Sequence, residues 1–257
     1  MLPKVKYIEN DFKIMSIFLL GKKTSYFVDG KKDFHSNEGM IKKVHLKNAR
    51  IGKSVKTNIG ESFYVVKPSI IDFIKHAGRL QQVILPKDAG MIIAETGVGP
   101  GSKVIDVGTG SGWLSMFLAY HVKPGKVYTY ETDERAIKIA KENFRNFGFK
   151  NIIIRKKDAS KGIREKNADL VTIDVKFPER IIPHAFKSLK IGGWISVYSP
   201  HIEEVKNVRK IISKFEFSYV KTLENIVREW QYEKTLRPKT VGLVHTGWLT
   251  FARKLGK

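Results

Sequence analysis

The sequence predicts an α/β fold whose mainly parallel sheet follows a small all-β domain and ends in an antiparallel hairpin. Three observations support this prediction. Short apolar runs separated by turn residues fill the first part of the 257-residue chain, strands and helices alternate after Pro86, and two long strands with no helix between them come last. We therefore predict a small domain over residues 1–80 and a larger one over residues 81–257.

The first domain has the pattern of short β-strands. The apolar runs Ile14–Leu20, Ser25–Val28 and Ser62–Val66 are bounded by turn residues such as those at 29–30 and 58–60. A short apolar stretch, residues 70–77, then follows Lys-Pro-Ser and is expected to form a linking helix.

The second domain has the alternation that builds a parallel sheet with right-handed crossovers. Its expected strands are short apolar runs, and its expected helices have capping residues or one apolar face. The two long strands at the end are joined by a loop that contains Pro238. The expected strands are Val104–Val107, Lys126–Glu131, Asn151–Arg155, Ala168–Val175, Trp194–Tyr198, Tyr219–Glu233 and Gly247–Arg253, and the expected helices are Gly112–His121, Asp133–Phe147, Arg180–Leu189 and Ile202–Phe215.

The composition limits the function. The absence of cysteine excludes a disulfide framework, a thiolate metal site and a cysteine nucleophile, and the seven histidines have no metal-ligand spacing, so no metal is expected. With 47 Lys and Arg against 25 Asp and Glu, the net charge of +22 implies a polyanionic partner, and nucleic acid is favoured over an anionic membrane. Without a signal peptide or a run of about 20 apolar residues, a cytoplasmic protein with no membrane partner is expected.

The sharpest local signal is the stretch Asp-Val-Gly-Thr-Gly-Ser-Gly at residues 106–112. It follows a predicted strand and opens a predicted helix, where glycines let the backbone approach a ligand and helix N–H groups point at it. A dinucleotide-binding loop needs G-x-G-x-x-G, and Trp113 stands where its third glycine would fall. Asp106 could instead pair with a cation, which suits S-adenosyl-L-methionine because its sulfur and its amino group are positively charged.

Four acidic residues follow or end four successive predicted strands. They are Asp106, Glu131, Asp158 and Asp174. Ligands in such sheets collect at the carboxyl ends of the strands, so the joint pattern favours a ligand site over four unrelated surface acids. Glu131 could accept hydrogen bonds from both ribose hydroxyls, and Asp158 could meet the adenine edge.

This combination resembles a class I methyltransferase. More specifically, the chain resembles the tRNA (adenine-N1)-methyltransferases of the T-loop, the TrmI-like family, whose archaeal and bacterial members are homotetramers. The resemblance covers residues 43–255, and the stretches at 82–89 and 244–254 are its most specific parts. The matching stretches are Gly60–Pro68, Gln82–Ala89, Gly108–Leu114, Tyr198–Val205, Arg228–Trp230 and Val244–Lys254.

The resemblance implies a Rossmann-like class I methyltransferase sheet, a small N-terminal β-barrel, the cofactor S-adenosyl-L-methionine and methylation of adenine N1 in tRNA. Asp174 corresponds to the family's catalytic residue, and we expect its carboxylate to accept a hydrogen bond from the exocyclic amine of the target adenine. The residues expected to bind the cofactor are Gln82, Asp106, Gly108, Thr109, Gly110, Ser111, Gly112, Trp113, Leu114, Glu131, Asp158 and Asp174.

Two departures from the family pattern concern the pocket for the target base. The family usually has Asp-Leu-Pro-x-Pro-Trp after the fourth strand, whereas residues 174–179 are Asp-Val-Lys-Phe-Pro-Glu, and Leu85 stands where tyrosine is common. Trp113, Tyr198 and Phe177 are candidates to supply the missing aromatic surface. Two alternatives stay open: a non-catalytic tRNA-binding subunit, and a class I methyltransferase with another substrate.

Overall fold

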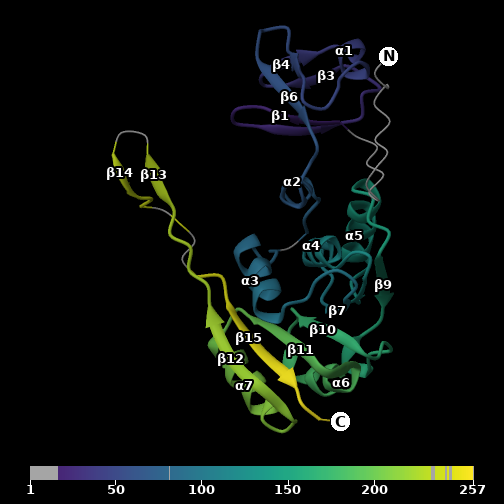
Figure 1. Cartoon of the computed structure of the whole chain (residues 1–257), viewed down its shortest axis with the longest axis vertical. Helices are drawn as coiled ribbons and strands as arrows, with labels where there is room; N and C mark the ends of the chain where they lie inside the picture. Colours follow the sequence, from purple (N-terminus) through teal and green to yellow (C-terminus); the bar gives the residue numbers. More distant parts are fainter. Residues whose placement is uncertain (1–16, 81, 233–234, 241, 243–244, 257) are drawn as a thin grey trace. The chain divides into compact units, whose positions relative to one another are not determined.

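The computed structural model describes residues 17–80, 82–232, 235–240, 242 and 245–256 (Figure 1). Part of the expected strand Ile14–Leu20 lies outside the described residues, as do Glu233 and Val244. The chain divides into two compact units, Met1–Gly78 with Glu142–Lys150, and Arg79–Lys141 with Asn151–Lys257.

The first unit contains an antiparallel sheet with the strand order β2-β1-β6-β5, next to the hairpin β3–β4. Leu19, Phe63 and Val65 of this sheet pack with Ile41 and Leu46 into a core of their own. The expected β-region and linking helix are therefore present, and one short helix, α1, was not expected. The elements are β1 (Ile17–Leu20), β2 (Ser25–Val28), β3 (Phe34–Ser36), β4 (Gly39–Ile41), α1 (Lys43–Lys47), β5 (Ser54–Lys56), β6 (Ser62–Val66) and α2 (Ile70–His76).

Helix α2 is the expected linking helix, and a capping box begins it. The backbone N–H and the hydroxyl of Ser69 both donate to Asp72 Oδ2, each at 2.7 Å. Such a cap satisfies N–H groups that have no partner within the helix. On the apolar face of α2, the Phe73 ring lies 5.1 Å from the Phe147 ring, centroid to centroid.

The second unit is built on a seven-stranded sheet with the order β12-β15-β11-β10-β7-β8-β9 (Figure 1). The five neighbouring strands β11, β10, β7, β8 and β9 are parallel to one another. Strand β15 runs antiparallel to both β11 and β12. The elements are α3 (Pro86–Thr96), β7 (Lys103–Val107), α4 (Trp113–Val122), β8 (Lys126–Glu131), α5 (Glu134–Asn146), β9 (Ile152–Lys156), β10 (Ala168–Ile173), α6 (Ile182–Ser188), β11 (Leu189–Ser199), α7 (Ile202–Ile212), β12 (Phe217–Glu224) and β15 (Trp248–Lys254). The end of α5, from Glu142, belongs to the first unit.

In the second unit, β11 begins at Leu189, earlier than expected, and two other regions differ more from the sequence prediction. Helix α3 was not expected, although Pro86 in its first turn and the left-handed Gly97 at its end are ordinary helix boundaries. The expected strand Tyr219–Glu233 is wrong as a single strand. It divides into β12 and β13 (Trp230–Tyr232), and β13 pairs with β14 (Leu236–Pro238) in a two-stranded sheet of its own.

Long-range contacts explain this division. The side chain of Asn225, just after β12, donates to the backbone carbonyl of Lys87 at 2.8 Å and so fixes the chain where the strand ends. Pro238, expected in a loop, occupies the last position of β14, and a two-stranded ribbon tolerates proline because both its strands are edges.

In the part of the chain that the structure describes, no helix is both long enough and apolar enough to cross a bilayer. The same residues contain no cluster of three or more metal-ligating side chains.

Candidate active site

The glycine-rich loop connects β7 to α4 at the carboxyl edge of the sheet. Gly108, Gly110 and Gly112 have φ values of +99°, +50° and +83°, a region that other residues rarely adopt. A Cβ atom on Gly108 would lie 2.1 Å from the carbonyl oxygen of Asp174, whose own N–H donates to the Val107 carbonyl at 2.8 Å. The loop and the end of β10 are therefore in close backbone contact, which places Asp174 beside the loop.

Asp106 lies beneath the loop, not in front of it. Its side chain is 0 % exposed, and it accepts hydrogen bonds from the hydroxyls of Ser115, Thr172 and Thr129 at 2.5, 2.7 and 3.2 Å. Burial raises the pKa of this carboxyl group, and the three hydroxyls oppose that shift. The carboxyl group therefore joins β7, α4, β8 and β10 below the loop, and its pairing with a cationic ligand stays a prediction.

Glu131, at the end of β8, holds the loop from the side. Its Oε2 accepts from the backbone N–H of Gly110 at 2.9 Å, and its Oε1 accepts from the N–H groups of Thr132 and Asp133 at 2.7 and 3.0 Å. Both carboxylate oxygens are thereby fixed in position at the edge of the sheet, where a ligand's hydroxyl groups would meet them.

A cleft of about 280 Å³ lies at this edge. Gly108, Glu131, Asp158, Phe177 and Arg180 are among the residues that line it. Sites for whole small molecules usually enclose roughly 300–1,000 Å³, so this cleft matches one part of a cofactor, such as its nucleoside end.

Asp158 is a second carboxylate that lines this cleft. The Ser160 hydroxyl and backbone N–H donate to its Oδ1 at 2.7 and 2.8 Å, and these bonds lower the pKa of Asp158. An ionised acceptor is therefore present next to Glu131.

Asp174 follows β10 and has a different electrostatic setting. Burial, with further contributions from the neighbouring carboxyl groups of Asp106 and Glu204, raises the pKa of Asp174 to about 7. Glu204, in α7, also has a raised pKa because of burial, and its Oε2 is buried without a hydrogen-bond partner among the described residues. Shifted carboxyl groups of this kind are typical of functional sites.

The three aromatic candidates differ in exposure. Phe177 is 55 % exposed in a left-handed backbone conformation, and the Arg180 guanidinium lies 4.8 Å from its ring centroid. Trp113 is only 3 % exposed, so its ring packs inside the protein and presents little aromatic surface. Tyr198 is partly buried, and its hydroxyl donates to the Thr246 carbonyl.

The other predicted binding residues are placed in two ways. Gln82 is exposed and is not among the residues that line the cleft. The side chains of Thr109, Ser111, Trp113 and Leu114 are buried, so the loop can offer a ligand its backbone groups while these side chains pack beneath it.

The sequence did not reveal a buried polar network next to this edge. The Lys87 ammonium group donates to Asp88 Oδ1, the Asn225 carbonyl and the Thr246 hydroxyl at 2.8, 2.5 and 2.7 Å. The Thr246 hydroxyl in turn donates to Asp88 Oδ2 at 2.8 Å, and the Tyr198 hydroxyl donates to the Thr246 carbonyl. The only sequence signal for this network was that the stretches containing Lys87 and Thr246 both resemble the family. That resemblance did not indicate that the two stretches lie in contact.

Comparison with known proteins decides the family. The family model described as "tRNA methyltransferase complex GCD14 subunit" matches residues 72–240. The chain belongs to this family. The tRNA (adenine(57)-N(1)/adenine(58)-N(1))-methyltransferase TrmI of Methanocaldococcus jannaschii is 34 % identical over 239 residues, which cover 82 % of this chain and 85 % of that protein. The tRNA (adenine(58)-N(1))-methyltransferase TrmI of Thermus thermophilus is 28 % identical over 225 residues, 86 % of this chain and 88 % of the relative.

Solved structures agree with the family assignment. A SAM-dependent O-methyltransferase of Thermotoga maritima superposes with a TM-score of 0.84 at 29 % identity, covering 94 % of this chain and 93 % of the other. The tRNA (m1A58) methyltransferase TrmI of Aquifex aeolicus gives 0.77 at 25 %, covering 96 % of this chain and 100 % of the other. The predicted fold class is confirmed: a class I methyltransferase sheet with a C-terminal antiparallel pair, preceded by a small β-region.

Proposed function

We propose that this chain is an S-adenosyl-L-methionine-dependent tRNA (adenine-N1)-methyltransferase that acts on the T-loop. The observation that carries the proposal is the position of Asp174 beside the glycine loop, at the edge where Glu131 and Asp158 line the cleft. The family assignment and the names of the two TrmI relatives point to the same reaction.

The cleft fits the cofactor at its nucleoside end. S-adenosyl-L-methionine, when bound, supplies a methyl group on a positively charged sulfur. Glu131 would accept from the ribose hydroxyls with oxygens already fixed by Gly110, and Asp158 would accept from the adenine amine. The N–H groups at the start of α4 would donate to the cofactor's carboxylate. These residue types match the cofactor without a metal ion.

The reaction requires little acid–base chemistry from the protein. N1 of adenine has a free lone pair, so the protein must orient the base and stabilise the positive charge that methylation leaves on the ring. The ionised Asp174 would do both, since it accepts from the exocyclic amine and carries a negative charge at that edge. A base with a carbonyl oxygen in place of the amine would be repelled.

Assembly and location form a second, separate part of the proposal. We propose a cytoplasmic homotetramer, with residues 1–80 and 81–257 as its domains. The sheet β13–β14 supports self-association because Trp230, Tyr232 and Leu236 expose large apolar side chains there, Tyr232 to 84 %. Light scattering on the purified chain tests this: a monomer at micromolar concentration would contradict it.

The decisive experiment is methyl transfer from labelled cofactor to an unmodified tRNA transcript, followed by nucleoside mapping. We expect 1-methyladenosine in the T-loop with the native chain, and a loss of turnover with Asp174→Asn while calorimetry still detects cofactor binding. RNA binding without cofactor affinity would identify a non-catalytic subunit. Labelling of a non-RNA substrate instead would identify a different methyltransferase, an outcome kept open by the O-methyltransferase description of the Thermotoga structure.

A further inference from the structure

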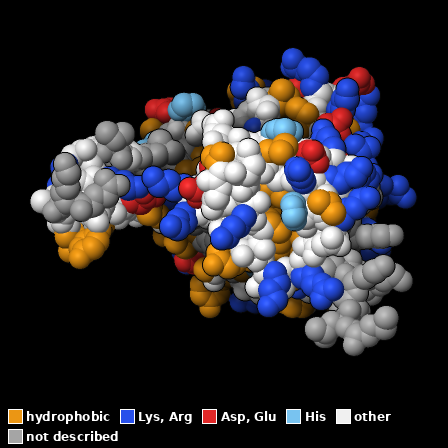
Figure 2. Space-filling view, turned by 90° about the horizontal axis from the view of Figure 1, so that it is seen from above, with side chains coloured by type: hydrophobic (Ala, Val, Ile, Leu, Met, Phe, Trp, Pro, Cys, Tyr) orange, Lys and Arg blue, Asp and Glu red, His pale blue; other side chains and the backbone are white. Residues whose placement is uncertain are grey.

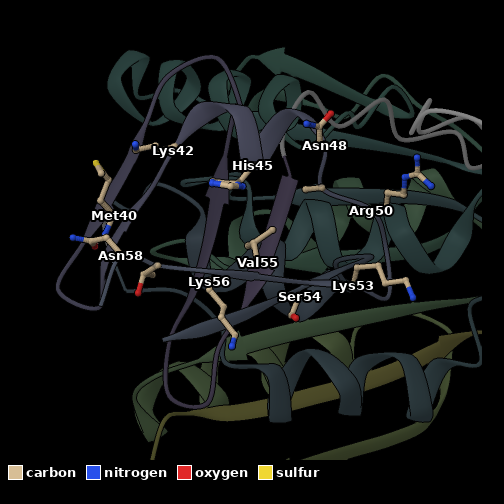
Figure 3. A pocket seen from close by; sticks show the side chains of 12 residues that line it. Met40, Lys42, His45, Asn48, Arg50, Lys53, Ser54, Val55, Lys56 and Asn58 are labelled. Atoms are coloured by element: carbon tan, nitrogen blue, oxygen red, sulfur yellow. The ribbon is translucent and has the colours of Figure 1, made fainter. Parts of the chain in front are cut away.

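A second cavity, of about 580 Å³, lies in the first unit (Figure 3). Its walls come from β4, α1, the segment 48–53 and β5, with Val55 at its centre (Figure 3). We call it the basic groove and define it by the lining residues on which the argument depends: Lys42, His45, Arg50, Lys53 and Lys56. None of these residues belongs to the cleft described above.

The charged side chains that line the groove are all positive. Among the residues that the structure describes, its lining contains Lys42, Arg50, Lys53 and Lys56 and no acidic residue. The four side chains are exposed, and none forms an ion pair with another residue in the described part of the chain. Figure 2 shows one face of the molecule, on which Lys and Arg are far more prominent than Asp and Glu. Four cations around one hollow repel one another, and an anionic ligand would relieve that repulsion.

The walls of the groove are fixed by the fold. Asn58 Oδ1 accepts from the Met40 N–H at 2.7 Å, and the Asn58 N–H donates to the Met40 carbonyl at 2.9 Å, which joins β4 to the segment after β5 at one side of the groove. The Lys53 carbonyl accepts from the Val65 N–H at 2.8 Å, so β6 holds the segment that carries Arg50 and Lys53. A preformed arrangement of this kind lowers the entropy cost of binding.

The lining also indicates which part of a nucleic acid would bind. In the described lining the only ring is that of His45, and these residues form no row of aromatic side chains on which unstacked bases usually lie. Amides and hydroxyls of Asn48, Ser54 and Asn58 accompany the cations, and such groups bind phosphate oxygens and 2′-hydroxyls. A sugar–phosphate backbone matches this chemistry better than bases do.

We propose that the basic groove binds the sugar–phosphate backbone of the RNA substrate and supplies affinity without base specificity. This inference rests on the proposed function, which makes RNA the substrate. It assigns the RNA contact of the first unit to Lys42, Arg50, Lys53 and Lys56, in preference to the other exposed cations of the same unit.

The test compares two variants with the same change in charge. One replaces Lys42, Arg50, Lys53 and Lys56 with Gln. The control replaces Lys22, Lys23, Lys31 and Lys32 with Gln; these residues are exposed in the same unit but do not line the groove. Fluorescence anisotropy measures the Kd of each full-length protein for a tRNA transcript at several salt concentrations, and calorimetry measures cofactor affinity.

We expect the groove variant to bind tRNA at least about 10-fold more weakly, with a salt dependence of log K that is shallower by roughly 0.7–0.9 per lost phosphate contact. The control should change the Kd by less than about 3-fold, and both variants should retain native cofactor affinity and thermal midpoint. Equal losses in the two variants, or no loss in either, would overturn the proposal. The proposal would also be overturned if the groove variant bound tRNA with native affinity but no longer bound a polyglutamate peptide that the native chain binds. That result would identify an acidic protein as the occupant.

The outcome is separable from that of the proposed function. If the native chain binds tRNA through the groove but transfers no methyl group, the proposed function fails and the groove assignment stands. If the native chain methylates tRNA while the groove variant keeps the native affinity and salt dependence, only the groove assignment fails.

Discussion

The Lys87 ammonium group lies 2.7 Å from the hydroxyl of Thr246, a residue 159 positions later in the chain. Through this contact α3, which precedes the sheet in sequence, is joined to the segment that leads into its last strand, β15. Asp88 completes the arrangement with hydrogen bonds from both residues, and its side chain is 1 % exposed. The two stretches that most resemble the family thus meet in one buried polar cluster beside Tyr198.

Replacement of Lys87 tests whether this cluster holds the fold together. Lys87→Met should lower the free energy of unfolding by about 3–5 kcal/mol, because it leaves Asp88 buried without its counter-charge. The double variant Lys87→Met with Asp88→Asn should recover part of that loss, since no charge stays buried. Urea titrations of the three proteins provide the measurement, and a single variant as stable as the native chain would contradict this role.

Gly108 should tolerate no side chain. In Gly108→Ala the Cβ atom would lie 2.1 Å from the Asp174 carbonyl oxygen at a φ of +99°, so the loop and the end of β10 must separate. We expect cofactor affinity, measured by calorimetry, to fall at least about 10-fold, because a distortion of the loop that costs about 1.4 kcal/mol of binding free energy weakens affinity tenfold. Gly99→Ala is the matched control, because nothing lies within 4 Å of its Cβ position and its φ is ordinary. Equal affinities in the two variants would show that the loop does not hold the cofactor.

The pH dependence of methyl transfer should report Asp174. Its pKa of about 7 means that the carboxyl group is protonated below that pH and cannot accept from the adenine amine. We therefore expect kcat/KM to rise about tenfold per pH unit below 7 and to level off above it. Glu204→Gln removes a neighbouring negative charge that raises this pKa, so it should move the rise to lower pH. A profile that is flat from pH 5.5 to 8.5 would exclude the assigned role.

Glu131 should control cofactor affinity through its two fixed oxygens. Glu131→Gln keeps the size of the side chain but replaces an acceptor with an N–H donor, which would oppose either Gly110 or the ribose hydroxyls. We expect about a 10-fold weaker cofactor affinity by calorimetry, near the value of one charged hydrogen bond. Glu134→Gln, three residues away and exposed at the start of α5, should bind the cofactor as the native chain does. Unchanged affinity in Glu131→Gln would contradict the proposed ribose contact.

Much of the fold was predictable because its signals are local. Strand–helix alternation, the glycines of the loop and the cap of α2 each depend on residues a few positions apart, and their periodicity or backbone conformation is visible in the sequence. The missed helix α3 had local signals as well, in Pro86 and Gly97. The strand expected over 219–233 failed for a different reason, since its end is fixed by the contact between Asn225 and Lys87.

The sequence by itself determined the order of elements, the glycine loop and the acids that follow the strands, because each of these features depends only on residues that are close together in the chain. Only the tertiary structure decided which of those residues line the cleft and which are buried beneath it. Strand order brings Glu131 and Asp158 to one cleft, while three hydroxyls from three elements surround Asp106 and make it a buried support. Likewise, ordinary surface lysines in the sequence become one basic groove because β4, α1 and β5 fold around a common hollow. Such groupings depend on long-range packing, which no local pattern of residues records.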